Sequence, residues 1–181
     1  MAYPTSIPTN KLTIRYKGLF DFDGLYNVMV QWLKVRRYWF HETKYKHKVP
    51  SPFGAEQEIT FKGDKKVTDF YAHAITVDLH LWDMTEVEVV QKGIKKMLTN
   101  ARIQIDIQGT LSLDYEKRWE TSSFWMAVRD WWMKYIMRRE IESIYYDELY
   151  YRTYRLHKII KEFLDMEAKG YEYEGYLGDN A

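Results

Sequence analysis

The stretch that decides the fold is RIQIDIQGTLSL, residues Arg102 to Leu113. Apolar and polar side chains alternate along it, and the apolar set is Ile103, Ile105, Ile107, Leu111 and Leu113. Because successive side chains of a strand point to opposite faces, this two-residue period predicts a strand with one buried and one wet face. Gly109 keeps the apolar parity, so it indicates either a bulge or a place where another element approaches the sheet closely.

Two further stretches share this period, Lys11–Lys17 and Ile75–Trp82. Turn residues at Gly63-Asp64 and Lys92-Gly93 favour two hairpins in the middle of the chain. The pattern therefore predicts an antiparallel sheet with one solvated face.

Helical spacing appears on both sides of the strand region. Residues 20–42 form the first candidate helix, with Asp21 or Asp23 as its cap. From Ser122 to Lys169 neither proline nor glycine occurs, and one straight helix of about 48 residues would be roughly 70 Å long. Such a helix must bend back or project from a domain of this size. The predicted fold class is α+β, an antiparallel sheet packed against an N-terminal helix and a very long C-terminal helix.

The composition of the chain limits which classes of protein and which kinds of site are possible. The chain has 181 residues, 46% hydrophobic and 29% charged, and its net charge is +1. We expect a flexible N-terminal arm over residues 1–10, a single α+β domain over 11–169 and a disordered acidic tail over 170–181. The absence of cysteine excludes disulfides, thiolate catalysis and cysteine-based zinc sites. We expect no cofactor and no metal, and neither a signal peptide nor a membrane span, so the predicted location is cytoplasmic.

The segment WMAVRDWWMKYIMRR, Trp125 to Arg139, has two apolar faces at 100° per residue. Aromatic side chains, Trp131 foremost, occupy one sector, and we expect them to pack across the sheet as core. The three methionines lie nearly opposite and need a second neighbour, which is the first helix, a partner subunit or an apolar ligand. A membrane-surface helix should show only one apolar face. The predicted ligand- or partner-binding residues are Met126, Trp132, Met133, Met137 and Trp32.

The second half of the C-terminal helix follows a 4,3 spacing typical of a helix that packs on another helix. It either folds back on its own domain or pairs with a second copy. For the homodimer, the predicted contacts are Tyr145, Leu149, Leu156, Ile159 and Phe163.

Basic and aromatic residues alternate in residues 34–48, and residues 92–102 add further cations without an acid. Cations for phosphates and rings for stacking are what single-stranded nucleic acid requires. The alternative function is therefore single-stranded nucleic-acid binding through Arg36, Arg37, Lys44, Lys46, Lys95 and Lys96. The plainer interpretation is two solvated edges with the rings in the core.

Catalytic signatures are scarce. No phosphate-binding glycine loop, nucleophile elbow or zinc-protease motif occurs in the sequence. Asp78, His80 and Asp106 lie on the face expected to be wet, where a solvated arrangement is the ordinary one, whereas His73 has the parity of a buried histidine. We therefore expect no autonomous enzyme and predict no catalytic residues.

The order of elements from Leu12 to Leu164 is strand, helix, antiparallel hairpins and long helix, and it resembles the START-like helix-grip fold. That resemblance implies a curved sheet that wraps the last helix around an apolar pocket, with binding of lipid-like or other apolar ligands. The function predicted from the whole sequence is a non-catalytic binding or interaction protein, self-associating, with an apolar surface for a small molecule or a protein partner beside the long helix.

Overall fold

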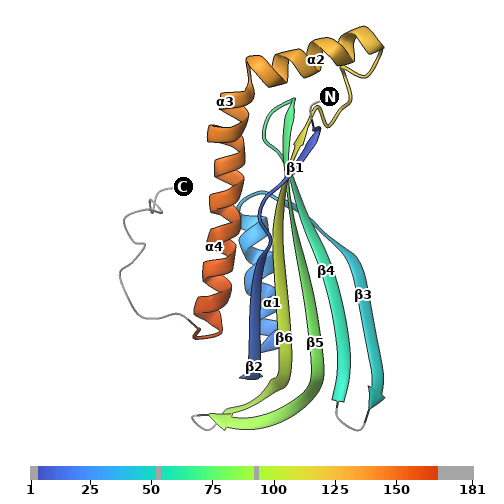
Figure 1. Cartoon of the computed structure of the whole chain (residues 1–181). Coiled ribbons are helices and arrows are strands. Elements are labelled where there is room, and N and C mark those ends of the chain that lie inside the picture. The colour runs from blue at the N-terminus through green and yellow to red at the C-terminus, as the bar shows by residue number, and fades with distance from the viewer. Residues whose placement is uncertain (1–3, 52–53, 92–93, 167–181) are drawn as a thin grey trace.

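A six-stranded antiparallel sheet organises the molecule (Figure 1). The computed structural model describes residues 4–51, 54–91 and 94–166. The strands are β1 (Ser6–Pro8), β2 (Leu12–Phe20), β3 (Trp39–Ser51), β4 (Gly54–Lys66), β5 (Tyr71–Gln91) and β6 (Ile94–Leu113). Their order is β1-β6-β5-β4-β3, and β2 also pairs with β6, along the same edge as β1. The predicted α+β class with an antiparallel sheet is confirmed.

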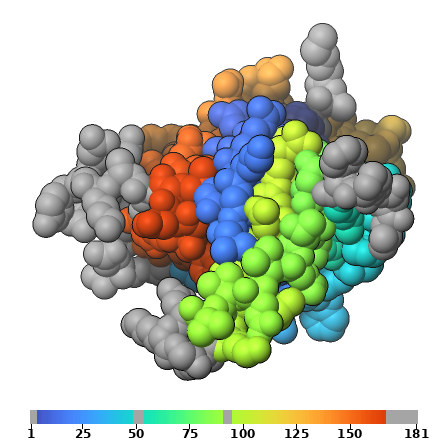
Figure 2. All heavy atoms as spheres, turned by 90° about the horizontal axis from the view of Figure 1, so that it is seen from below, coloured from blue at the N-terminus to red at the C-terminus, as the bar shows by residue number. Residues whose placement is uncertain are grey.

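Helices cover one face of this sheet and extend beyond one of its ends. They are α1 (Phe22–Val35), α2 (Ser123–Tyr135), α3 (Arg138–Glu140), the wider π-helical turn η1 (Ile141–Tyr146) and α4 (Asp147–Phe163). In Figure 1, α1 and α4 lie against the strands, and α2 sits past their upper end. Seen from below, α4 (red) lies beside the N-terminal elements (blue), and β3 and β4 (cyan) lie on the opposite side (Figure 2).

The alternation in β5 and β6 builds the core as expected. The predicted apolar face of these strands is buried, with Ile75, Val77, Ile103, Ile105 and Ile107 at 0–1% exposure. The same buried cluster contains Leu25, Met29 and Leu33 of α1 and Leu149, Leu156 and Ile160 of α4. The helices that cover the face are therefore α1 and α4, and the expectation that the Trp131 segment packs across it is wrong.

Two glycines let the helices approach the sheet closely. A methyl group added at Gly109 would lie 2.9 Å from Leu149 Cγ, and one added at Gly63 would lie 2.9 Å from Leu33 Cδ2. Both glycines are register partners of Ile75, so they flank one position in the middle of the sheet. Of the two alternatives for Gly109, the close approach of another element is the correct one.

The N-terminal arm is not loose where the structure describes it. Ser6–Pro8 form β1, which pairs with residues 110–112 of β6. The backbone N–H of Thr9 donates to the Gly109 carbonyl at 2.8 Å, and the Thr9 hydroxyl accepts from the Gly109 N–H at 3.0 Å. Within the expected flexible arm, Ser6–Pro8 are therefore an edge strand, and residues 1–3 lie outside the described ranges. Pro8 is compatible with this position, since proline is tolerated in an edge strand. The predicted tail, residues 170–181, lies outside the described residues.

The first helix ends earlier than its sequence pattern suggests. Arg37 adopts a left-handed conformation with φ 61°, and the N–H groups of Arg37 and Tyr38 donate to the carbonyls of Lys34 and Leu33. This is the Schellman arrangement, in which glycine is the usual left-handed residue. Because arginine gives no such signal in the sequence, the predicted helix over residues 20–42 was too long, and Trp39–Glu42 belong to β3.

The expected hairpin turn at Gly63-Asp64 is also wrong, since both residues lie inside β4. The chain reverses between β4 and β5 at residues 67–70 instead, where the Val67 and Thr68 N–H groups donate to the Tyr71 carbonyl. The turn expected at Lys92-Gly93 falls on residues outside the described ranges.

The very long C-terminal helix is two helices. It breaks after Tyr135, where the N–H groups of Ile136 and Met137 both donate to the Trp132 carbonyl. The longest continuous helix has 26 residues and ends at Phe163, followed by a second Schellman turn with Asp165 at φ 52°. Met133 and Ile141 are buried on either side of the break. Because of the bend, the helices on both sides of it bury apolar side chains against the rest of the protein. A straight helix that continued past the end of the sheet would leave one of these sets exposed.

His73 is buried in β5, at 1% exposure, as its parity predicts. Burial lowers its pKa to about 4, against the opposing influence of the Glu148 carboxylate. The unfolded chain, with an ordinary histidine pKa near 6.5, therefore binds a proton more readily than the folded one. His73 therefore has almost no effect on the free energy of unfolding above about pH 6.5, and it lowers that free energy as the pH falls from about 6.5 toward 4.

We expect the free energy of unfolding to fall by roughly 2 kcal/mol between pH 7 and pH 5 because of His73. Urea unfolding at a series of pH values measures this loss, and His73→Leu should remove it. His157, whose pKa is also lowered by burial, leaves a smaller slope of the same sign in the variant. Equal slopes in parent and variant would show that His73 is not held neutral.

Candidate interaction surface

Helix α2 presents a broad aromatic face to solvent. Its exposed large apolar side chains are Phe124, Trp125, Met126, Trp131, Trp132, Tyr135 and Ile136. At 3.6 residues per turn, all of these except Met126 fall in a sector of about 140° that contains no charged residue. Phe124 and Tyr135 are about two-thirds exposed, and Trp131 is 55% exposed. Because monomeric proteins rarely expose large contiguous apolar patches, this face is a candidate interaction surface.

The inner face of α2 consists of the two residues of that helix that are buried, Arg129 and Met133. The faces are therefore the reverse of those expected, because the aromatic sector points outward and part of the methionine stripe points inward. Trp131 is not a core residue.

A buried ion cluster fixes this orientation. The Arg129 guanidinium lies 3.5 Å from Asp114 Oδ2, 3.5 Å from Glu120 Oε1 and 3.2 Å from Asp130 Oδ1. The Asp114 carboxylate also accepts hydrogen bonds from the backbone N–H groups of Arg118 and Trp119. The loop between β6 and α2 is thus wrapped around Asp114, and Arg129 attaches the helix to that loop.

The rings of the outer face also contact one another. Trp119 of the loop meets Trp125 edge to face, with ring centroids 5.8 Å apart, and Phe124 meets Trp125 at 5.6 Å. The Ser122 side chain caps the helix by accepting from the Trp125 N–H at 3.3 Å. These contacts order the rings before any partner arrives, and this lowers the entropy cost of binding.

The five predicted ligand-binding residues do not form one site. Trp32 is buried in α1 and stacks on Tyr38 with ring centroids 6.3 Å apart. In Figure 1, α1 lies against the strands and α2 lies past their upper end. Met133 is fully buried, and Met137 packs against the core. Only Met126 and Trp132 are exposed, and they belong to the surface of α2.

The predicted dimer seam mostly folds back on its own sheet. Leu149 and Leu156 are fully buried in the core, which corrects the expectation that they face a partner. Tyr145 stacks on Tyr71 at 4.0 Å, and Ile159 packs against the core. Phe163 is partly exposed.

The cations of the two basic segments do not form one stripe. Lys44 and Glu58 form an ion pair, Lys95 lies 2.8 Å from Glu88, and Lys96 lies 2.6 Å from Asp21. The segments are also apart, since β3 forms one edge of the sheet and the β5–β6 hairpin curves away below it (Figure 1). Lys46 is exposed on β3, and Arg36 lies over the Trp32 ring at 4.3 Å. Arg37 borders a hollow beside the turn between α1 and β3.

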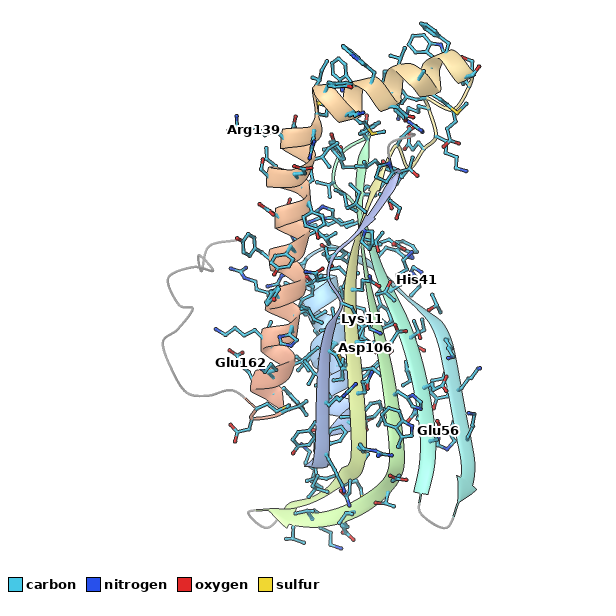
Figure 3. The ribbon with its side chains drawn as sticks, viewed as in Figure 1. Lys11, His41, Glu56, Asp106, Arg139 and Glu162 are labelled. Carbon is cyan, nitrogen blue, oxygen red and sulfur yellow. The ribbon has the colours of Figure 1, made fainter. Side chains whose placement is uncertain are left out.

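The open face of the sheet carries polar pairs spread over its surface (Figure 3). Asp106 lies 2.8 Å from the Lys11 ammonium and accepts from the Thr13 hydroxyl at 2.6 Å. Burial opposes ionisation of Asp106, but hydrogen bonds from Lys11, Thr13 and Gln104 outweigh it, so its pKa is lowered. Asp78 accepts from Thr60 at 2.7 Å. Asp78 and Asp106 are thus register partners held in separate polar contacts.

Sequence reasoning missed Glu56 and Glu58, which join His80 on this face. Their ligand atoms lie within 4.8 Å of one another, a spacing that suits a metal ion. However, Lys48 lies 3.5 Å from Glu56, Lys44 pairs with Glu58, and His80 Nε2 lies 2.7 Å from Glu56 Oε1. The carboxylates are therefore already neutralised by protein cations. The available signal was the alternation of Glu56 and Glu58 along one strand with Lys44, Lys46 and Lys48 along its neighbour.

The sequence matches no protein-family model and no curated protein. Among the described residues, no helix is long and apolar enough to cross a membrane.

Two alanine variants distinguish the observed orientation of α2 from the expected one. Met133→Ala removes a fully buried side chain and should cost about 2–5 kcal/mol, whereas Trp131→Ala should cost less than about 0.5 kcal/mol in the protomer. Denaturant unfolding at low protein concentration measures both values. A larger loss for Trp131→Ala than for Met133→Ala would mean that the aromatic face is the core face.

Proposed function

We propose that this protein acts by binding, and that the aromatic face of α2 is its interaction surface, occupied first by a second copy of the chain. The proposal rests on one observation: α2 exposes five aromatic rings, while its inner face is already held in place by the ion pair of Arg129 with Asp114. Aromatic residues are enriched at the centres of protein interfaces, and twofold dimers are the commonest assemblies.

The size of the surface supports a dimer. An aromatic side chain contributes roughly 150–250 Å² when fully buried, so five half-exposed rings offer on the order of 500 Å². Met126, Ile136 and Ile144 extend the exposed apolar area toward the roughly 800 Å² per partner of a standard interface. An antiparallel pair of α2 helices brings the same surface from each copy together, as twofold symmetry requires.

A second exposed stripe supports the same partner. Ile144, Tyr151 and Tyr154 are exposed along the outside of the helix that follows the bend. Ile144 and Tyr151 are seven residues apart, the heptad distance of helix pairing. The predicted self-association is therefore retained, but through the outward side of these helices and not through Leu149 and Leu156.

The helix-grip resemblance and the cytoplasmic location stay predictions. At Gly109 the side chains of Leu149 and Thr153 approach the sheet directly. For this reason the proposal draws on the outer surface of α2 and not on an apolar pocket under α4.

Light scattering coupled to size-exclusion chromatography tests the dimer. We expect twice the 22.0 kDa chain mass for the parent protein. The double variant Trp131→Lys/Tyr135→Lys should elute as a monomer with nearly unchanged folding, because both side chains are exposed. Val35→Lys, on an exposed apolar residue of α1, is the matched control and should remain dimeric.

A monomeric parent protein at micromolar concentration would contradict self-association. If that monomer sedimented with lipid vesicles, and the double variant did not, the surface would be a membrane-contact site and the second-copy proposal would be wrong. A dimer that survives the double substitution would place the interface elsewhere.

A further inference from the structure

A second feature, separate from α2, is a hollow of about 860 Å³ beside the turn between α1 and β3. Its lining includes the cations Arg37, Lys62, Lys65 and Lys66, the rings of Tyr38 and Trp39, and one carboxylate, Asp64. The first residue of β3, Trp39, pairs with Asp64, so β4 runs two residues further with no β3 partner. The hollow lies at this uncovered edge.

The positive charge around the hollow is not balanced. Lys62 lies 3.4 Å from Asp64 and Lys66 lies 3.6 Å from Glu116. Within the described part of the chain, neither Arg37 nor Lys65 has a carboxylate within ion-pair distance. These two cations can therefore take an external anion without first breaking an ion pair.

The charge of a further cation, Arg152, acts on Lys65 although Arg152 does not line the hollow. Burial lowers the pKa of Lys65, and the Arg152 and Arg37 guanidinium groups lower it further, against Glu148. The Glu148 carboxylate, which opposes this shift, is held by Arg152 at 2.9 Å. An anion bound beside Lys65 offsets the repulsion from the two guanidinium groups.

Arg37 is left-handed, with φ 61°, because it ends α1 in a Schellman turn, as Asp165 does after α4. This conformation costs an L-residue energy that glycine avoids, so Arg37→Gly should be tolerated. The side chain that the strained residue carries is the arginine that lines the hollow.

Aromatic surface lies beside the cations. Trp39 is 77% exposed at the rim, and the Lys65 ammonium lies 5.6 Å from the centre of the Tyr38 ring. An exposed ring next to free cations suits a ligand that has both a flat base and a phosphate.

We propose that this hollow binds a nucleotide, with its phosphate on Arg37 and Lys65 and its base stacked on Trp39. The volume fits one nucleotide. The paired lysines of β3 leave no continuous track for a longer strand. The proposal does not depend on the dimer, because it involves no residue of α2.

Calorimetric titration of the full chain with adenosine monophosphate, and separately with inorganic phosphate, tests this site. Arg37→Gly removes the charge and relieves the left-handed strain, so the free variant should melt at the same temperature or higher. Its affinity for both ligands should fall at least about tenfold. Trp39→Ala should weaken the nucleotide by about tenfold and phosphate by less than twofold.

Asp165→Gly is the matched control, since Asp165 occupies the same Schellman position after α4 and does not line the hollow. It should leave both affinities unchanged. Absence of nucleotide binding at millimolar concentration, or equal affinity of the parent and Arg37→Gly, would overturn the proposal. Binding of a single-stranded oligonucleotide with a steep salt dependence, without binding of the mononucleotide, would overturn it in favour of a nucleic-acid strand.

Discussion

Arg129→Met should lower the free energy of unfolding by about 3–5 kcal/mol, the range for removing one partner of a buried ion pair. The side chains of Arg129 and Asp114 are only 7% and 2% exposed. Methionine keeps most of the volume of arginine but leaves Asp114 buried without its counter-charge. The loss therefore reports the ion cluster and not a cavity.

Denaturant unfolding of the parent and the variant measures this loss. Arg138→Met is the matched control, because Arg138 pairs with Glu142 on the exposed side of the helix after the bend and should cost less than about 1 kcal/mol. Amide hydrogen exchange should show that α2 is the first helix to lose protection in Arg129→Met. Equal stability losses for the two variants would mean that Arg129 does not anchor α2.

Gly109→Val should destabilise the protein by about 3 kcal/mol, although valine is the better strand residue. The reason is the distance of 2.9 Å between an added methyl group and Leu149 Cγ, with Thr153 Cγ2 at 3.0 Å. Without α4 above it, the same substitution would stabilise β6. The sign of the effect thus tests whether α4 packs on the sheet at this point.

A double-mutant cycle with Leu149→Ala isolates that contact. Leu149→Ala alone should cost about 2–5 kcal/mol, and Gly109→Val should cost clearly less in its presence, because the shorter side chain leaves room for the added methyl groups. Strict additivity of the two losses would contradict the close approach.

The sheet was predictable because its signal is local. From Ile103 to Leu113 every second position is apolar or glycine, so the buried face follows from the sequence alone. The burial of His73 follows from the same parity, whereas at Gly109 the parity left a bulge and a close approach as alternatives. The helices that cover that face were predicted in part, since an N-terminal and a C-terminal helix were expected on the sheet, but the Trp131 segment was expected where α4 lies.

The predictions of the helix ends and of the buried face of α2 were wrong for identifiable physical reasons. Arg37 and Asp165 end their helices in left-handed conformations that nothing in their residue types announces. The aromatic face of α2 was taken as core because rings usually are. The residue that decides its orientation is Arg129, whose partner Asp114 lies across a loop and is found only in the folded chain.

The candidate sites were predicted in part. The sequence singled out the helix of α2 and the basic residue Arg37, but it grouped the methionines with Trp32 and joined the Arg37 segment to Lys95 and Lys96. These groupings assumed proximity that the sheet does not provide, since β3 and the β5–β6 hairpin lie apart.

The distance between α2 helices of two copies tests the central claim most directly. The chain has no cysteine, so Lys134→Cys, at the margin of the aromatic face, accepts a single spin label. A helix of 13 residues is only about 20 Å long, so paired α2 helices should place the two labels within about 30 Å in a pulsed dipolar measurement. A label at Lys46→Cys, on β3, should give a much longer distance. A short distance for Lys46 with none for Lys134, or no dipolar coupling at either site, would contradict self-association through α2.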